Sequence, residues 1–310
     1  MPLAHPLHRI STNVRFLTGS LLLPEHAAAL AERLFLTPPR MSDPSRLPVS
    51  TFFDFLDAHA GFVEYRGRNL ATWRWGPLDA PGVVLAHGWG GYAAQMRGFV
   101  PRLLAEGYRV IAYDQPAHGL SEGRLTGLPD FAGALAAVAA SHGGVEHVIA
   151  HSLGAVATAV AIAPGRSFAA HGLALKSAVL VSPPSDLVGY SRQFARWTWM
   201  PESLRAAMQA AIEERFGLRW VELEVARLAP HLRTPALVIH DHGDGVVPWS
   251  QGAALARAWP GARLLSTAGL GHGRILESDV ATRAAADFIA GKSAVASPAA
   301  PALPHPAPLY

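Results

Sequence analysis

The pattern of apolar and polar positions between about residue 60 and residue 290 predicts an α/β fold. Short apolar runs rich in Val, Ile and Leu alternate there with helix-length segments. The apolar runs lie at 83–86, 109–113, 145–150, 178–181, 236–239 and 262–265, and the helical patterns at 93–106, 128–141, 153–163 and 279–290. Runs that are apolar at nearly every position are typical of parallel strands buried on both faces. We therefore predict a mostly parallel central sheet with helices on both faces, opened by an antiparallel hairpin whose strands, 62–65 and 70–75, flank Gly67.

The segments outside this alternation predict four regions. Residues 56–182 and 231–290 form the core, and residues 183–230, which contain helical patterns and no strand, form an inserted helical lid. Residues 1–55 form a helical arm with an amphipathic helix from Glu25 to Phe35. Residues 291–310 are rich in Ala and Pro and predict a disordered tail.

Composition removes several classes of function. The 310 residues include no cysteine, which excludes a thiol nucleophile, a disulfide scaffold and a cysteine-ligated metal. A formal net charge of +3 is too small to indicate nucleic acid as the partner. With 50% hydrophobic and only 16% charged residues, the chain can bury a large core.

Targeting signals are weak, so we expect a cytoplasmic protein without stable membrane insertion. Residues 16–23 resemble the apolar part of a signal peptide, but Thr18, Gly19 and Ser20 dilute it. The most apolar run, 148–163, is shorter than the roughly 20 residues that span a bilayer.

A candidate nucleophile follows the strand that ends near Ile149. The run Ala150-His151-Ser152-Leu153-Gly154 places Ser152 at the apex of a strand–turn–helix pattern, with a small residue two positions away on each side. A sharp turn needs small neighbours because strand and helix backbones approach closely there, and the turn exposes the hydroxyl at the N-terminus of the helix. This context favours Ser152 as a catalytic nucleophile.

The chain resembles the α/β-hydrolase family, in particular its serine esterases and lipases, over roughly residues 60–290. Four motifs carry the resemblance in the expected order: residues 86–91 after the first parallel strand, residues 114–121, the Ser152 turn, and the loops after the last two strands. The resemblance implies an oxyanion hole made by the backbone N–H groups of Trp89 and Leu153. It also implies that Asp114 and His118 are structural rather than catalytic.

A serine nucleophile needs a base and an acid that orients the base. In this fold the chain order is Ser, then Asp or Glu, then His. The family's acid loop selects Asp244, which precedes Val246-Val247-Pro248, with Asp241 as the alternative, and the Gly-rich loop after the final strand presents His272 as the general base. Successive strand residues point to opposite faces, so His240 and His242 would share a face without Asp241, and a metal bound there would need a third ligand from elsewhere. We expect no metal and no cofactor.

The sequence therefore predicts a serine hydrolase that cleaves small to medium apolar carboxylic esters through an acyl-enzyme. Thioesterase, lactonase, peptidase, acyltransferase and cofactor-free perhydrolase chemistry use the same triad and stay open. A non-catalytic protein that binds an apolar ligand is the alternative from another class. The lid aromatics Tyr190, Phe194, Trp197 and Trp199 are candidates for the substrate pocket, and the protein is expected to be a monomer or homodimer.

Overall fold

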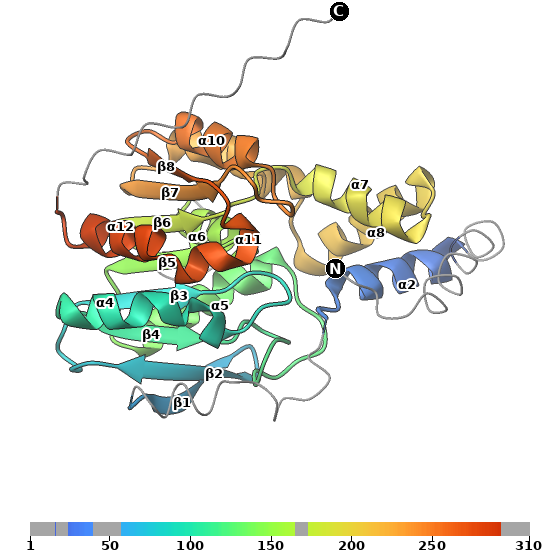
Figure 1. Cartoon of the computed structure of the whole chain (residues 1–310). Coiled ribbons are helices and arrows are strands. Elements are labelled where there is room, and N and C mark those ends of the chain that lie inside the picture. The colour runs from blue at the N-terminus through green and yellow to red at the C-terminus, as the bar shows by residue number, and fades with distance from the viewer. Residues whose placement is uncertain (1–15, 17–23, 40–56, 165–172, 293–310) are drawn as a thin grey trace, which may run out of the picture.

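The eight strands predicted from the sequence form one sheet (Figure 1). The computed structural model describes residue 16 and residues 24–39, 57–164 and 173–292. Strand order across the sheet is β1-β2-β4-β3-β5-β6-β7-β8. The strands are β1 (His59–Tyr65), β2 (Arg68–Trp75), β3 (Gly82–Ala86), β4 (Arg109–Tyr113), β5 (His147–His151), β6 (Ser177–Val181), β7 (Ala236–Asp241) and β8 (Arg263–Thr267).

The sheet is antiparallel at one edge and parallel elsewhere. Strand β2 pairs antiparallel with both β1 and β4, whereas every pair from β4 to β8 is parallel. The carboxyl ends of the parallel strands therefore meet at one edge of the sheet, where ligand sites lie in open α/β sheets.

Alternate residues of the buried strands supply two cores. Val84 and Val148 face helices α5 (Leu128–Ser141) and α6 (Leu153–Ala161), together with α10 (Trp249–Ala258). Val83 and Ile149 face the opposite layer, which consists of the 3₁₀ helix η2 (Ala93–Phe99), α4 (Val100–Ala105) and α12 (Asp279–Ile289). The continuous apolar runs arise because helices cover both faces.

The helical pattern predicted at 93–106 is divided into η2 and α4. Pro101 lies in the first turn of α4, and its ring would clash with the carbonyl of Arg97 in a continuous α-helix. A tighter 3₁₀ segment before Val100 avoids that clash.

The chain between β6 and β7 is helical and contains no strand. We call this segment the insertion; it comprises α7 (Leu187–Thr198), α8 (Glu202–Phe216), η3 (Trp220–Glu222), α9 (Val225–Leu228) and η4 (Ala229–His231). Helix α7 begins where the side chain of Asp186 accepts a hydrogen bond from the Gly189 N–H, and it ends at Trp199, whose φ is 55°. In Figure 1, α7 and α8 lie to one side of the sheet, beside α2 (Pro24–Leu36).

Two predicted regions fall mainly outside the described residues. Helix α2 and residues 37–39 are the described part of the N-terminal arm, together with Phe16; the signal-like residues 17–23 and the predicted tail from 293 onward are not described. Among the described residues, no helix combines the length and apolar character that a membrane span requires.

Candidate active site

Ser152 occupies a sharp turn between β5 and α6. Its φ of 53° and ψ of −122° lie in a region that L-residues rarely adopt, and its backbone N–H donates to the Val181 carbonyl at 2.9 Å. Such backbone strain persists only where the surrounding structure holds it, and it is concentrated at functional sites. The turn leaves the side chain half-buried at the carboxyl end of the sheet.

Two glycines make this turn possible. A Cβ on Gly154 would lie 2.6 Å from the carbonyl oxygen of His87, and a Cβ on Gly88 would lie 2.7 Å from the Cβ of Ser152. Both distances are shorter than real Cβ contacts. The loop after β3, the serine turn and the first turn of α6 are therefore packed directly on one another.

The predicted base and acid form a hydrogen-bonded pair. His272, in the short helix α11 (Gly271–Arg274) after β8, donates from Nδ1 to Asp244 Oδ2 at 2.7 Å. The other carboxylate oxygen, Oδ1, accepts the backbone N–H groups of Val246 and Val247, both at 2.9 Å. With Nδ1 protonated and donating, the Nε2 of His272 carries the lone pair that a general base needs.

Burial raises the pKa of Asp244, but hydrogen bonds outweigh it. The imidazoles of His240 and His272 and the N–H of Val247 stabilise the carboxylate, so the pKa of Asp244 is well below its usual value. The side chain of Asp244 is nevertheless completely buried, whereas that of His272 keeps 17% of its surface exposed. A buried anion thus orients the candidate base, which remains accessible.

His240 is a second histidine on Asp244 that sequence reasoning considered only as a metal ligand. Its Nε2 lies 3.0 Å from the Val247 carbonyl and 3.4 Å from Asp244 Oδ2. His242 instead stacks on Trp249, with ring centroids 4.4 Å apart. Within the described ranges, no group of three or more His, Asp and Glu side chains is arranged to hold a metal ion.

Asp241, the alternative candidate for the acid, has a different set of hydrogen-bond partners. Its Oδ1 accepts from the Gly243 N–H at 2.8 Å, and its Oδ2 accepts from the Thr267 hydroxyl at 2.7 Å and the Leu270 N–H at 3.1 Å. These bonds tie the end of β7 to the loop that precedes His272. Asp241 therefore braces the loop, and it is Asp244 that contacts the imidazole.

Two buried histidines brace the loop that contains Trp89. His118 accepts the Gly90 N–H at Nε2 (2.9 Å) and donates from Nδ1 to the Pro116 carbonyl (3.0 Å). His87 accepts the Gln115 N–H at Nε2 (2.9 Å) and donates from Nδ1 to a carbonyl of its own loop (2.7 Å). Since each ring both accepts and donates, both are neutral. Burial lowers the pKa of His118 to about 4, and it lowers the pKa of His87 well below its usual value.

Asp114 also holds the loops next to these histidines in place. It accepts the Ala93 N–H at Oδ1 (2.7 Å) and the Leu120 N–H at Oδ2 (2.8 Å), and burial raises its pKa to about 6. Asp114 thus links the loop after β4 to the start of η2. These contacts agree with a structural role for the 114–121 motif.

His151, the residue before the candidate nucleophile, contacts the candidate base. Its Nε2–H donates to the backbone carbonyl of His272 at 3.0 Å, and the two ring centroids are 4.6 Å apart. Burial and the neighbouring His272 lower the pKa of His151 to about 3, so the ring is a neutral donor. Sequence reasoning missed this contact because it links residues 121 positions apart.

A cavity of about 490 Å³ contains the candidate nucleophile and base in its lining. Ser152, Leu153, Trp89 and His272 line it together. Most of the remaining lining is apolar and comes from the insertion, the start of α5 and the N-terminal arm. In the described part of the chain, His272 is the one lining side chain of a basic or acidic type.

Of the four aromatic residues predicted for the pocket, two line this cavity. Tyr190 and Trp197 are on the face of α7 that borders it. Phe194 is instead buried between α7 and α2, and Trp199 is 66% exposed. The prediction was wrong for these two, because Phe194 points into the helix–helix contact and Trp199 lies beyond the last turn of α7 in a left-handed conformation.

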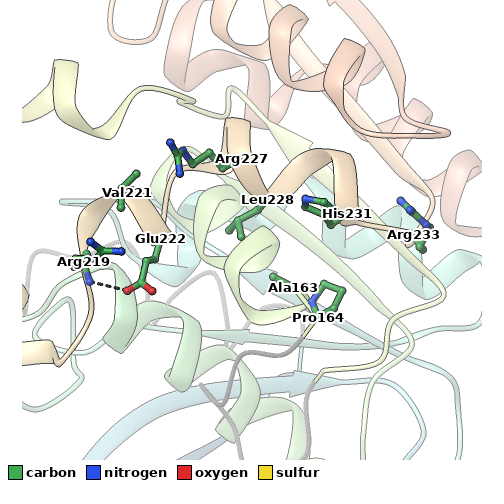
Figure 2. A pocket seen from close by; sticks show the side chains of 9 residues that line it. All are labelled: Ala163, Pro164, Arg219, Val221, Glu222, Arg227, Leu228, His231 and Arg233. Carbon is green, nitrogen blue, oxygen red and sulfur yellow. Dashed lines mark hydrogen bonds between the residues drawn. The ribbon is translucent and has the colours of Figure 1, made fainter.

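The N-terminal arm supplies lining residues that the sequence did not indicate, namely Phe35, Leu36 and Pro39. Their apolar character is the same as that of any amphipathic helix end, so no local signal distinguishes them. A second cavity, of about 530 Å³, is shown in Figure 2 and is lined by Arg219, Arg227 and Arg233 among others. None of the predicted catalytic residues lines it.

Comparison with known proteins identifies the family of this chain. Residues 83–290 match the alpha/beta hydrolase family. The chain belongs to this family. A non-heme chloroperoxidase of Streptomyces lividans is 28% identical over 254 residues, which are 67% of this chain and 91% of that protein.

Two solved esterases share the fold of this alpha/beta hydrolase. The Pyrococcus furiosus esterase Pf2001 superimposes with a TM-score of 0.59 at 19% identity, covering 81% of this chain and 98% of its own. The esterase RhEst1 from Rhodococcus sp. ECU1013 gives a TM-score of 0.52 at 23% identity, covering 76% and 99%.

Proposed function

We propose that this alpha/beta hydrolase is a serine esterase that cleaves uncharged, apolar carboxylic esters through an acyl-enzyme. The observation that carries the proposal is the shared cavity, because Ser152 and the Asp244-linked His272 both line it. A nucleophile, a base and an orienting acid are the groups that acyl transfer requires.

In the proposed mechanism, Ser152 Oγ attacks the ester carbonyl carbon while His272 Nε2 takes the hydroxyl proton. The backbone N–H groups of Trp89 and Leu153 stabilise the negative charge that develops on the carbonyl oxygen. Leu153 is the first residue of α6, so its N–H has no acceptor within the helix. His272 then protonates the leaving alkoxide, and the alcohol departs.

Deacylation repeats these roles with water. His272 Nε2 removes a proton from a water molecule as that water attacks the acyl carbon, and it returns the proton to Ser152 Oγ when the acid leaves. Asp244 accepts the hydrogen bond from Nδ1–H of His272 throughout, and its negative charge stabilises the imidazolium that forms twice in each cycle.

The insertion supports the substrate assignment. Tyr190 and Trp197 of α7 and Trp220 of η3 line the cavity, and we propose that the insertion acts as its lid. Since no Lys, Arg, Asp or Glu of the described residues lines the cavity, a charged acyl or alcohol group would lose its hydration there without a partner.

Perhydrolysis is a second candidate. It is favoured by the similarity to the Streptomyces lividans chloroperoxidase, because a peroxidase uses hydrogen peroxide. In that reaction hydrogen peroxide takes the place of water. It attacks the acyl carbon, a peracid leaves, and Ser152 regains its proton. The measurement is peracid formation from a short carboxylic acid and hydrogen peroxide, compared with ester hydrolysis by the same preparation.

The test of the proposal is hydrolysis of p-nitrophenyl acetate and butyrate by the wild type and by Ser152→Ala. We expect hydrolysis by the wild type and a loss of about 10³-fold or more in kcat for the variant. Ser250→Ala is a matched control, because Ser250 is exposed on α10. Full activity in Ser152→Ala would overturn the nucleophile, and an inactive wild type would favour the apolar-ligand-binding alternative.

Thioesters, lactones and peptides form the second panel, since the same triad serves all of them. Turnover of a thioester or a lactone at a higher kcat/KM than every simple ester would replace the ester assignment. Acyl transfer is tested by adding an alcohol and measuring the new ester.

A further inference from the structure

The N-terminal helix α2 and the insertion share one apolar core. Helix α2 packs against α8, and the buried cluster at this contact contains Ala27 and Ala31 of α2 and Met208 and Ile212 of α8. Small side chains on α2 allow close approach, and an ion pair between Glu32 and Arg215 borders the contact. Figure 1 shows α2 running alongside α8, away from the sheet.

The last residue of α2 and the residues that follow it contact the loops near the candidate oxyanion hole. The backbone carbonyl of Leu36 accepts the Thr126 N–H at 2.9 Å, just before α5. A Cβ on Gly90 would lie 2.8 Å from Cγ of Pro39, so Pro39 packs on the loop that contains Trp89. Residues 35–39 therefore connect the insertion to the loop that precedes η2.

Three aromatic rings hold Phe35 in position. Its ring centroid lies 5.9 Å from that of Tyr190, 5.2 Å from that of Phe194 and 5.6 Å from that of Trp220. Tyr190 and Trp220 line the catalytic cavity with Phe35, while Phe194 supports the cluster from the helix–helix contact. Edge-on and tilted ring contacts of this kind favour one fixed arrangement.

We propose that the end of α2 and the residues after it, through Phe35, Leu36 and Pro39, form a wall of the catalytic cavity that determines substrate specificity, and that Phe35 limits the size of the apolar group accepted there. This inference rests on the proposed esterase function. The wall is uncharged and apolar, so the group that contacts it is a neutral alkyl or aryl part of the ester. It lies outside residues 83–290, which match the family, so this part of the specificity belongs to the chain's own N-terminal segment.

The experiment compares Phe35→Ala and Phe35→Trp with the wild type on two ester series. One series is p-nitrophenyl acetate to octanoate, which varies the acyl group, and the other is methyl to octyl acetate, which varies the alcohol. In Phe35→Ala we expect kcat/KM, relative to that of the shortest ester of the series, to rise about fourfold for each added methylene that gains room in one series. Phe35→Trp should shift the preference toward shorter esters.

Phe62→Ala is the matched control, because Phe62 is 70% exposed on β1 and is not among the residues that line the cavity. Circular dichroism and thermal unfolding establish that each variant is folded, and Phe35→Leu replaces Phe35→Ala if the latter unfolds. An unchanged preference for ester length in folded variants would overturn the proposed specificity wall. So would a change in kcat/KM by the same factor at every length in both series. Failure of the esterase proposal is distinguishable, because the wild type would then hydrolyse no member of either series.

Discussion

Replacing Asp244 by Asn tests the proposed triad through its proton positions. Asp244 Oδ1 accepts two backbone N–H groups at 2.9 Å, from Val246 and Val247, and Oδ2 accepts the Nδ1–H of His272 at 2.7 Å. The amide oxygen of Asn must accept the hydrogen bonds from the two backbone N–H groups, because an NH₂ group in its place would be a donor opposed to two other donors. The NH₂ group then faces His272, whose Nδ1 has to become the acceptor. The proton moves to Nε2, and the ring can no longer accept a proton from Ser152.

The size of the effect follows from these contacts. Turning the amide over would leave the part-buried N–H of Val246 and the buried N–H of Val247 without an acceptor, the latter at about 1–3 kcal/mol, so the wrong tautomer is the less costly outcome. We expect kcat for p-nitrophenyl acetate to fall about 10³- to 10⁴-fold, the loss associated with an incorrect histidine tautomer. KM should change by less than about threefold, because Asp244 does not line the cavity.

Asp241→Asn is the comparison that separates the acid from the brace. Asp241 accepts three hydrogen bonds, from Gly243, Thr267 and Leu270, and an amide would oppose at least one of these donors. We expect a loss of about 1–3 kcal/mol in the free energy of unfolding, measured with urea, and a kcat within about tenfold of the wild type. A folded Asp244→Asn variant that keeps more than a tenth of wild-type kcat, or an equal loss of kcat in the two variants, would contradict the assignment of Asp244 as the acid.

Four further measurements follow from contacts at the site. His151→Phe keeps a ring beside His272 but removes the hydrogen bond to its carbonyl, so we expect kcat to fall about tenfold with KM unchanged, and an unaltered kcat would show that the bond does not position the base. Gly154→Ala places a Cβ 2.6 Å from the His87 carbonyl and should lower the free energy of unfolding by about 1–3 kcal/mol in urea titrations, which an unchanged midpoint would contradict. Trp197→Ala should change kcat/KM for longer esters whereas Trp199→Ala should not, because Trp197 lines the cavity and Trp199 does not; equal effects would argue against Trp197 as a lining residue of the substrate cavity. The free energy of unfolding should fall as the pH drops from 6.5 toward 4. Burial lowers the pKa values of His118 and His151 to about 4 and about 3, so over this range the two histidines bind protons in the unfolded chain but not in the folded one. The raised pKa of Asp114, about 6, acts in the opposite sense and offsets roughly one histidine, so these three groups together give a net loss of about 3 kcal/mol between pH 7 and pH 4, to which the lowered pKa of His87 adds. A stability independent of pH over this range would contradict the prediction.

The fold was predictable from the sequence because its signals are local. Continuous apolar runs such as 83–86 and 236–239 arise from strands covered on both faces, and each run is visible without knowledge of its neighbours. The position of Ser152 was predictable for the same reason, since the small residues two positions away satisfy a steric need within one turn.

Contacts between distant segments were not predictable. The apolar residues of α2 fit any amphipathic helix, and nothing local indicates that Phe35 meets Tyr190 and Trp220 from the other end of the chain. Phe194 and Trp197 are both aromatic and only three positions apart, yet one packs on α2 and the other borders the cavity. Such differences are decided by which helix covers which face.

The proposed base follows β8, the edge strand of the parallel part of the sheet. The five residues of β8 are all at least partly exposed, whereas β3, β4, β5, β6 and β7 are buried throughout. Strand β8 pairs on one side only, with β7, and the Thr267 side chain and the Leu270 N–H at its end are held by Asp241. Edge strands open more easily than central ones, and such openings are sub-global. Detachment of β8 would carry His272 away from Ser152 while both main cores stayed folded, so we expect activity under mild denaturation to be lost with hydrogen exchange at this edge rather than with global unfolding.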